Sequence, residues 1–173
     1  MIKAAQSIVN EMRKLVFIET GVNIPEIVIK TNGNLQHALG LAEHNIIVEG
    51  DKQWVEYRIT LNTRAFKGKE SSKVFRKIVI HEFCHIADVV VNGFMKGHGR
   101  GWSQLMRMCG ERAEALVSKE DTDELGYSVY RYFHACGCKT HGVSLKTHRA
   151  IVSGTQHHCN VCYTDISPTF KFL

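Results

Sequence analysis

The 173-residue sequence predicts an α+β fold that ends in a small, cysteine-rich subdomain. Residues 2–18 place apolar side chains at helical spacing over about five turns. Residues 54–62 instead alternate between apolar and polar side chains, as a half-buried strand does. Residues 128–173 hold four of the six Cys and five of the ten His. We therefore expect a body over residues 1–126 and a small β subdomain over residues 127–173.

The first half of the body is predicted to be a helix followed by strands. The helix over residues 2–18 ends before Gly21, since glycine interrupts the helical pattern. In the 54–62 strand, the apolar side chains occupy alternate positions and share one face; they are Val55, Tyr57, Ile59 and Leu61. The three expected strands cover residues 26–31, 46–49 and 54–62, with a turn at residues 32–34.

Two helices are predicted for the second half of the body. The first covers residues 73–91, with Ser71-Ser72 as its N-terminal cap and Asn92-Gly93 as its end. A glycine-rich loop leads to the second helix, over residues 102–118. The acidic stretch 119–126 has almost no apolar side chains and is interpreted as the boundary of the body. Short β-like pieces are expected beyond it, at residues 127–133, 151–152 and 170–173.

Composition excludes several classes of protein. No run of 18 apolar residues exists, so we expect no transmembrane helix and no membrane association. Charged residues interrupt the apolar positions of the N-terminus, which argues against a signal peptide. We therefore expect a cytoplasmic monomer in a reducing compartment, where clustered cysteines more often bind metal than form disulfides.

Charge is distributed unevenly along the chain. Residues 1–127 contain 17 Lys and Arg against 16 Asp and Glu, whereas residues 128–173 contain five against one. A nearly neutral body is thus followed by a basic tail. A basic patch of this kind is a mild indication of nucleic-acid binding.

The strongest motif is His81-Glu82-Phe83-Cys84-His85, an HExxH pattern within the predicted 73–91 helix. Residues i and i+4 lie above one another on a helix, so both imidazoles can bind one Zn²⁺ from the same side. Glu82 lies about 100° around the helix from His81, from where it can reach a water on the metal without being a ligand. The pattern is typical of a catalytic zinc site.

A catalytic zinc needs a third protein ligand and an open fourth position. His98 is preferred because it lies in a glycine-rich loop that can fold back over the metal. Asp88 follows on the same helix and would more often support a ligand than bind the metal itself. Glu111 and Glu114 are the remaining candidates, although an exposed helix face explains both.

The tail contains a second metal motif, Cys159-x-x-Cys162. Two intervening residues let both thiolates face one tetrahedral ion. The residues available for the other half of this site are Cys136, Cys138, His141 and His148. A structural zinc would let so short a tail fold without a large core.

The motifs together resemble the SprT/Spartan family of zinc metalloproteases. HEFCH is followed, thirteen residues after His85, by His98 in the sequence His98-Gly99-Arg100-Gly101-Trp102, and that family continues with HGxxW. Residues 57–62 resemble the strand before the family's active-site helix, and residues 136–162 resemble the zinc ribbon of its bacterial branch. The likeness runs from about Val28 to Cys162.

The resemblance implies a zincin-like metalloprotease domain with Glu82 as catalytic acid/base. It also implies His81, His85 and His98 as ligands of a catalytic zinc. The family comparison favours a structural zinc held by four cysteines, with His141 as a substitute ligand; these are Cys136, Cys138, Cys159 and Cys162. Eukaryotic relatives cut proteins crosslinked to DNA and are stimulated by DNA. The partners it implies are therefore DNA, single-stranded or at a junction, and proteins bound to that DNA.

Tail residues suited to single-stranded DNA are cations interleaved with aromatic rings. These are Arg131, Lys139, Lys146, His148 and Arg149, with Tyr130, Tyr132 and Phe133. Alternatively, the rings form the core of the ribbon and the cations a solvated face. If the 54–62 strand lies at the sheet edge above the metal, it could pair with the backbone of an extended substrate.

Two rival functions remain open at the level of sequence. One is a nucleic-acid-binding zinc protein whose HExxH site is structural or regulatory. The other is a zinc hydrolase acting on non-protein amides, such as cell-wall peptides. A purely structural site would not require Glu82.

Overall fold

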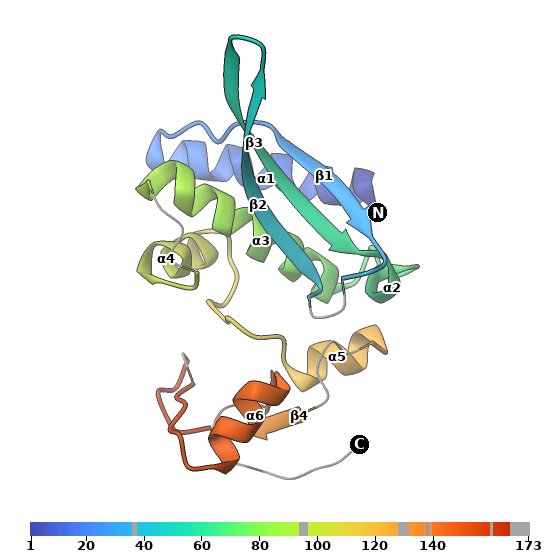
Figure 1. The fold of residues 1–173 in the computed structure, drawn as a ribbon, viewed down its shortest axis with the longest axis vertical. Coiled ribbons are helices and arrows are strands. Elements are labelled where there is room, and N and C mark those ends of the chain that lie inside the picture. The colour runs from blue at the N-terminus through green and yellow to red at the C-terminus, as the bar shows by residue number, and fades with distance from the viewer. Residues whose placement is uncertain are drawn as a thin grey trace. The chain divides into compact units, whose positions relative to one another are not determined.

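The computed structural model describes residues 1–35, 38–93, 97–127, 132–136, 138, 140–159 and 161–166, with the backbone alone at residues 133 and 140. The chain forms two compact units, Met1–Arg112 and Ala113–Leu173 (Figure 1). The expected division between residues 126 and 127 therefore lies later than the one observed. The helix α5 (Lys119–Leu125) explains the difference, since it packs on the strand β5 (Thr140–Val143) and so belongs to the second unit.

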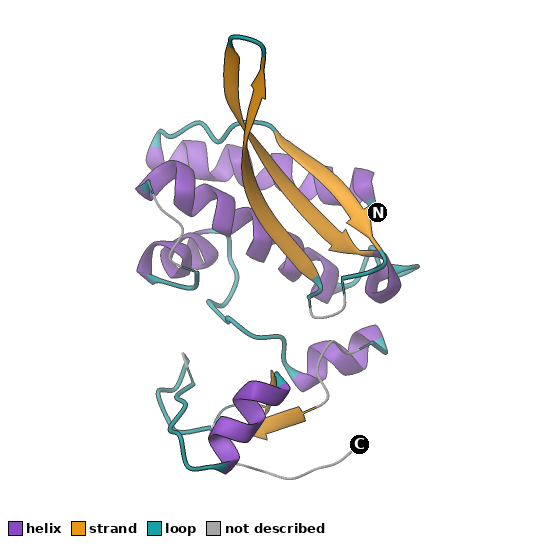
Figure 2. Ribbon diagram, in the orientation of Figure 1, coloured by secondary structure: helices purple, strands orange, loops and turns teal. Residues whose placement is uncertain are grey.

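A three-stranded sheet and two long helices build the first unit. Its strands are β1 (Ile27–Asn32), β2 (Gly40–Glu49) and β3 (Lys52–Asn62), in the spatial order β1-β3-β2. β1 runs parallel to β3, and β2 antiparallel to it. The helices α1 (Ile2–Thr20) and α3 (Lys73–Asn92) pack on the same face of the sheet (Figure 2). The mixed α+β class is confirmed.

The 54–62 strand does not lie at the sheet edge, so the condition for substrate pairing along it is not met. β3 is the central strand, hydrogen-bonded to β1 on one side and to β2 on the other. The edge strand that packs on α3 is β2, which begins six residues before the predicted 46–49 segment. Its first residues, Gly40-Leu41-Ala42-Glu43, have little β-propensity, and pairing with β3 determines their conformation instead.

The helix α3 agrees closely with its prediction. The hydroxyl of Ser72 accepts the backbone N–H of Phe75 and so caps the first turn, and Gly93 follows the last residue. One side of the helix is buried in the core, including Ile78, Phe83 and Ile86. Because this apolar side fixes the rotation of the helix, it also fixes where the polar side chains of residues 81–85 point.

A short helix α2 (Thr63–Phe66) ends the sheet region. The side-chain oxygen of Asn62 accepts the N–H groups of Arg64 and Ala65, while its amide donates to the carbonyls of Leu35 and Ala38. Asn62 is fully buried. One side chain thus caps α2 and also binds backbone carbonyls in the segment that precedes β2.

The predicted 102–118 helix is wrong in length. The helix α4 covers only Arg100–Met108, and Gly110 then adopts a left-handed conformation with φ of 78°.

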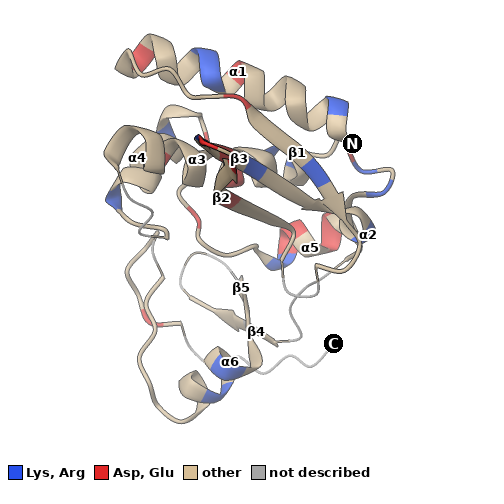
Figure 3. Ribbon diagram, turned by 45° about the horizontal axis from the view of Figure 1, so that its top comes forward, with Lys and Arg blue, Asp and Glu red and all other residues tan. Residues whose placement is uncertain are grey.

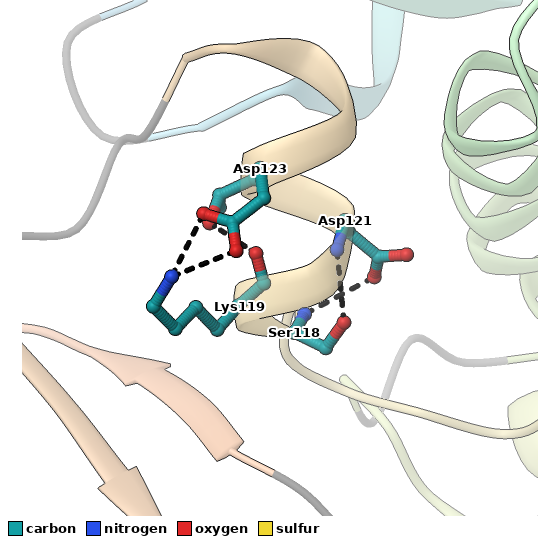
Figure 4. A network of polar contacts seen from close by, with 5 residues as sticks. Ser118, Lys119, Asp121 and Asp123 are labelled. Atoms are coloured by element: carbon teal, nitrogen blue, oxygen red, sulfur yellow. Dashed lines mark hydrogen bonds and ion pairs between the residues drawn. The ribbon is translucent and has the colours of Figure 1, made fainter.

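The acidic stretch interpreted as a boundary is instead the helix α5. The hydroxyl of Ser118 accepts the N–H of Asp121, and the Asp121 carboxylate accepts the N–H of Ser118 (Figure 4). This capping box, with a Lys119–Asp123 ion pair, stabilises a helix that periodicity alone does not reveal.

The second unit combines a β-hairpin with a helix. β4 (Tyr132–Ala135) pairs antiparallel with β5, and α6 (Leu145–Val152) follows. The β-like piece predicted at residues 151–152 lies in α6, whose N-terminus is capped by Ser144. Of the piece predicted at 127–133, residues 132 and 133 lie in β4 and residues 128–131 lie outside the described residues, as does the piece at 170–173. The small core consists of Val143, Ile151, Cys159 and Ile166.

No helix in the described parts of the chain is both long and apolar enough to cross a bilayer.

Candidate metal centres

Three histidine side chains converge in the first unit. His81 and His85 lie on the same face of α3, and His98 lies in the segment just before α4. The Nε2 atom of His81 is 3.3 Å from that of His85 and 3.0 Å from that of His98. All three donor atoms lie within 4.8 Å of one another, a spacing suited to one shared ion. The structure therefore brings together the three histidines that the sequence selected.

Trp102 packs against all three imidazoles. Its indole is fully buried and stands between 4.5 and 5.6 Å from the three imidazoles, measured between ring centroids. Its Nε1–H donates a 3.4 Å hydrogen bond to the backbone carbonyl of His81. Since Trp102 is on α4, it ties His98 and the start of that helix to α3. The sequence motif includes this residue, but its supporting contacts become visible only in the fold.

Burial keeps the imidazoles neutral. It lowers the pKa of His81 to about 2, with a further contribution from the charges that His85 and His98 would carry. The pKa of His85 falls to about 4 for the same two reasons, burial and His98, and burial also lowers the pKa of His98. A neutral imidazole has a free lone pair on one ring nitrogen. Three such nitrogens facing one point fit the donor set of a zinc ion with an open coordination position.

Glu82 lies beside this cluster and is held by the edge strand. Its buried carboxylate accepts the backbone N–H of Ala42 in β2. Burial raises the pKa of Glu82 to about 8, and the Ala42 hydrogen bond opposes that rise. A divalent cation on the histidines would favour the ionised form, since it adds the largest charge in the neighbourhood. Burial and a bound cation would therefore act in opposite directions on the pKa of Glu82.

Gly40 makes this approach of β2 to Glu82 possible. A Cβ atom at position 40 would lie 2.6 Å from Cγ and 2.9 Å from Oε1 of Glu82. No real Cβ contact is that short, so any side chain here must displace either the carboxylate or the strand. No sequence motif marked Gly40, because the constraint depends on two segments that meet only in the fold.

The other candidate ligands lie elsewhere. Asp88 is buried and accepts a 2.6 Å hydrogen bond from Asn92, and it does not join the three-histidine group. Glu111 follows the end of α4, and Glu114 belongs to the second unit. Among the described residues, His98 is thus the side chain that completes the group.

Four sulfur atoms converge in the second unit. The Sγ atom of Cys138 is 3.3 Å from that of Cys136 and 3.7 Å from that of Cys159. These sulfurs and that of Cys162 all lie within 4.8 Å of one another. Four thiolates at this spacing form a closed tetrahedral donor set, as structural zinc sites do. Cys84 and Cys109 lie apart from them, buried in the first unit with sulfurs 4.0 Å from each other.

Hydrogen-bond donors lie beside two of the four sulfurs, those of Cys159 and Cys162. The backbone N–H of Val161 points to the sulfur of Cys159. The hydroxyl of Thr164, followed by its backbone N–H, lowers the pKa of Cys162 to about 6. His141 is not a member of the four-sulfur group, but its Nε2 lies 3.2 Å from the sulfur of Cys136. His148 instead stacks on Tyr132 and is hydrogen-bonded to His134.

Comparison with protein families matches residues 5–122 to the SprT-like family, which is more than half of the chain. The protein named Protein SprT from Glaesserella parasuis serovar 5 (strain SH0165) is 29% identical over 121 residues, 66% of this chain and 75% of that protein. Protein SprT from Pasteurella multocida (strain Pm70) is 26% identical over 99 residues, 57% of this chain and 59% of that protein. No solved structure matches the chain. The family that the motifs indicated is confirmed, and the chain belongs to the SprT-like family.

Proposed function

We propose that the chain is a zinc-dependent endopeptidase of zincin-like architecture that cleaves proteins bound or crosslinked to DNA. The observation that carries the proposal is the convergence of His81, His85 and His98 beside a buried glutamate that an edge strand holds in place. A site that only stabilised the fold would not require Glu82. The close packing of Glu82 on Gly40 and Ala42 therefore favours catalysis over the structural alternative.

Each residue of the site has a defined task in peptide hydrolysis. Zinc bound by the three imidazoles would act as a Lewis acid and lower the pKa of a water molecule to about 7. Glu82 would take a proton from the attacking water and deliver it to the departing amine. The N–H of Ala42 keeps the carboxylate oriented during both transfers. Trp102 holds the imidazole rings of His81 and His98 in position through its contacts with both rings.

The substrate backbone would pair with β2, in place of the β3 segment that the sequence suggested. The N–H of Ala42 points toward Glu82 and away from β3. In an antiparallel strand, the backbone N–H and C=O groups of alternate residues point to the same side. The backbone groups of His44 and Ile46 therefore also face the open edge of β2. Pairing through backbone groups would give broad sequence specificity, which suits a protease that acts on many DNA-bound proteins.

The second unit would supply the DNA contact. Lys146 and Arg149 are exposed cations on α6 (Figure 3). Tyr163 is an exposed aromatic ring, 77% accessible, that follows the Cys159-x-x-Cys162 knuckle and had no part in the sequence prediction. Tyr132 is less suitable, because it packs on the small core and stacks on His148. Arg131, Lys139 and Tyr130 lie outside the described residues, as does the side chain of Phe133.

The test of the proposed function is cleavage of a small protein crosslinked to a defined oligonucleotide. The zinc-loaded full chain should cut the protein into fragments with new N-termini, identified by mass spectrometry. Single-stranded DNA should accelerate the reaction relative to the same protein without DNA. Absence of cleavage with and without DNA, at verified zinc loading, would refute the proposal. Cleavage of cell-wall peptides without cleavage of proteins would instead favour a zinc hydrolase that acts on non-protein amides.

Removing the α6 cations should weaken DNA binding in a salt-dependent way. For Lys146→Ala combined with Arg149→Ala, the slope of log affinity against log salt should decrease by about 0.7 for each lost phosphate contact on a single strand. Fluorescence anisotropy with a labelled single strand measures the slope. Lys3→Ala combined with Lys67→Ala removes two exposed cations of the first unit and serves as the matched control. Equal slopes for the two double variants would place the DNA elsewhere.

A side chain at Gly40 should damage catalysis more than stability. Gly40→Ala puts a methyl group into the space of Glu82, and overpacking of this kind typically costs about 1–3 kcal/mol. We expect at least a tenfold loss of kcat with unchanged zinc content, since the histidines are not touched. Gly33→Ala is the control, because its added Cβ meets Thr63 and Arg64 rather than the site. A Gly40→Ala protein with wild-type kcat would show that the position of Glu82 is not critical.

A further inference from the structure

The hairpin formed by β2 and β3 projects beyond the helices at its turn end (Figure 1), and we refer to residues 43–58 of this hairpin as the arm. Large apolar side chains are exposed along it: Ile46 is 63% accessible, Val48 67%, Trp54 43% and Val55 45%. Single exposed apolar residues are ordinary on a protein surface, but a cluster on one projecting element indicates a binding surface.

The register places these side chains on both faces of the arm. Ile46 lies opposite Val55, so the two share a face, and Val48 follows Ile46 on that same face. Ile47 lies opposite Trp54, and this second pair occupies the other face. A partner that follows the arm can therefore contact apolar side chains from either side.

The charge of the arm identifies the class of partner. The arm carries Glu43, Glu49, Asp51 and Glu56 against Lys52 and Arg58, a net charge of −2 in a chain of net charge +5. The ion pair between Arg58 and Glu56 is already included in this net charge, and the remaining excess comes from Glu43, Glu49 and Asp51 against Lys52. Acidic character disfavours the phosphates of nucleic acids and the headgroups of anionic lipids. It also disfavours pairing with the arm of a second copy, so a basic, apolar polypeptide is the partner that fits.

The arm is continuous with the proposed active site. Its open edge is the edge of β2, where the N–H of Ala42 holds Glu82. A strand rises about 3.3 Å per residue, so Ile46 lies about 13 Å and Val48 about 20 Å along the strand from Ala42. A substrate strand paired with β2 at the site would reach these side chains after four to six residues.

We propose that the arm is an accessory substrate-binding surface that holds an extended, basic and apolar segment of the substrate protein, four to six residues from the bond to be cleaved. The cleavage part of this inference rests on the proposed endopeptidase function. Recognition at the arm is independent of the catalytic groups. The arm would select exposed basic segments, which are common in proteins that bind nucleic acids.

The test uses two labelled peptides with the same cleavable core. One carries a ten-residue extension that alternates Val with Lys, and the other an extension that alternates Ser with Glu. Binding to the zinc-loaded full chain carrying Glu82→Gln is measured by fluorescence anisotropy, and cleavage by the chain without that substitution is measured in parallel. We expect the Val–Lys peptide to bind at least tenfold more tightly than the Ser–Glu peptide.

Variants of the arm should remove this preference. Val48→Ser combined with Val55→Ser should bring the two affinities within about twofold, and Glu49→Gln combined with Asp51→Asn should reduce the salt dependence of Val–Lys binding. The control, Phe17→Ser combined with Ile18→Ser, alters apolar residues on α1 that are 55% and 74% accessible and should leave the preference unchanged. These arm side chains are exposed, so the substitutions should leave thermal unfolding unchanged.

The possible outcomes separate the two proposals. Equal binding of both peptides, an arm variant that binds as the parent does, or binding of single-stranded DNA that the arm variants lose would overturn the inference. Association of the chain through the arm, detected as an arm-dependent dimer, would overturn it too. If the core is not cleaved but binding depends on the arm, the endopeptidase proposal fails and the binding surface stands.

Discussion

Replacing Glu82 by Gln should reduce peptide cleavage by about 10²–10⁴-fold, the usual contribution of a general acid/base. Glutamine has nearly the same shape and can still accept the N–H of Ala42 through its side-chain carbonyl. It cannot take a proton from water or return one to the leaving amine. The loss should appear in kcat, measured with a quenched fluorescent peptide under saturating conditions.

The same variant should remain folded and loaded with metal. None of the three histidines is changed, and burial already favours the uncharged form of Glu82, so a neutral amide introduces no new cost of desolvation. Zinc content and thermal midpoint should therefore match those of the parent protein. A Glu82→Gln protein that keeps more than a tenth of the parent kcat would contradict the role assigned to this residue.

Replacing Cys159 by Ser should unfold the second unit and leave the first intact. Cys159 is both one of the four grouped sulfurs and a member of the small core with Val143, Ile151 and Ile166. Serine removes a ligand and buries a hydroxyl. Structural zinc contributes about 10–16 kcal/mol of apparent binding free energy in small zinc domains, far more than this core can replace.

Metal analysis and hydrogen exchange measure this effect. Zinc content should fall from two ions to about one per chain, and amide protection should disappear from β4, β5 and α6 while that of α3 persists. Cys109→Ser is the matched control, since Cys109 is a buried cysteine of the first unit outside the four-sulfur group. A Cys159→Ser chain that keeps two ions and a protected second unit would show that the sulfur cluster is not a structural zinc site.

The parts of the fold that local sequence determines were predictable. α1 and α3 bury a continuous apolar stripe, and Ser72 and Gly93 mark the ends of α3. The two histidines of HExxH meet because helical geometry places residues i and i+4 together. Cys159 and Cys162 meet for a similarly local reason. His98 was selected because a glycine-rich loop allowed it to return to the helix, and the structure brings it there.

The parts that depend on pairing between distant segments were not predictable. An alternating strand pattern does not distinguish the central β3 from an edge strand, and the start of β2 has little strand propensity of its own. The helices α5 and α6 are short and depend on the caps Ser118 and Ser144. Gly40 and the supporting contacts of Trp102 reflect close approaches that exist only once the chain is folded.

We propose that the three histidines hold a zinc ion and that Glu82 acts as the acid/base beside it. The most direct test removes all metal with a chelator and returns zinc in steps while cleavage of a short peptide is followed. We expect activity to disappear, to return in full by two equivalents, and to stay absent in His98→Ala, which should take up about one equivalent. Full activity in the chelated protein, or in His98→Ala, would contradict this proposal.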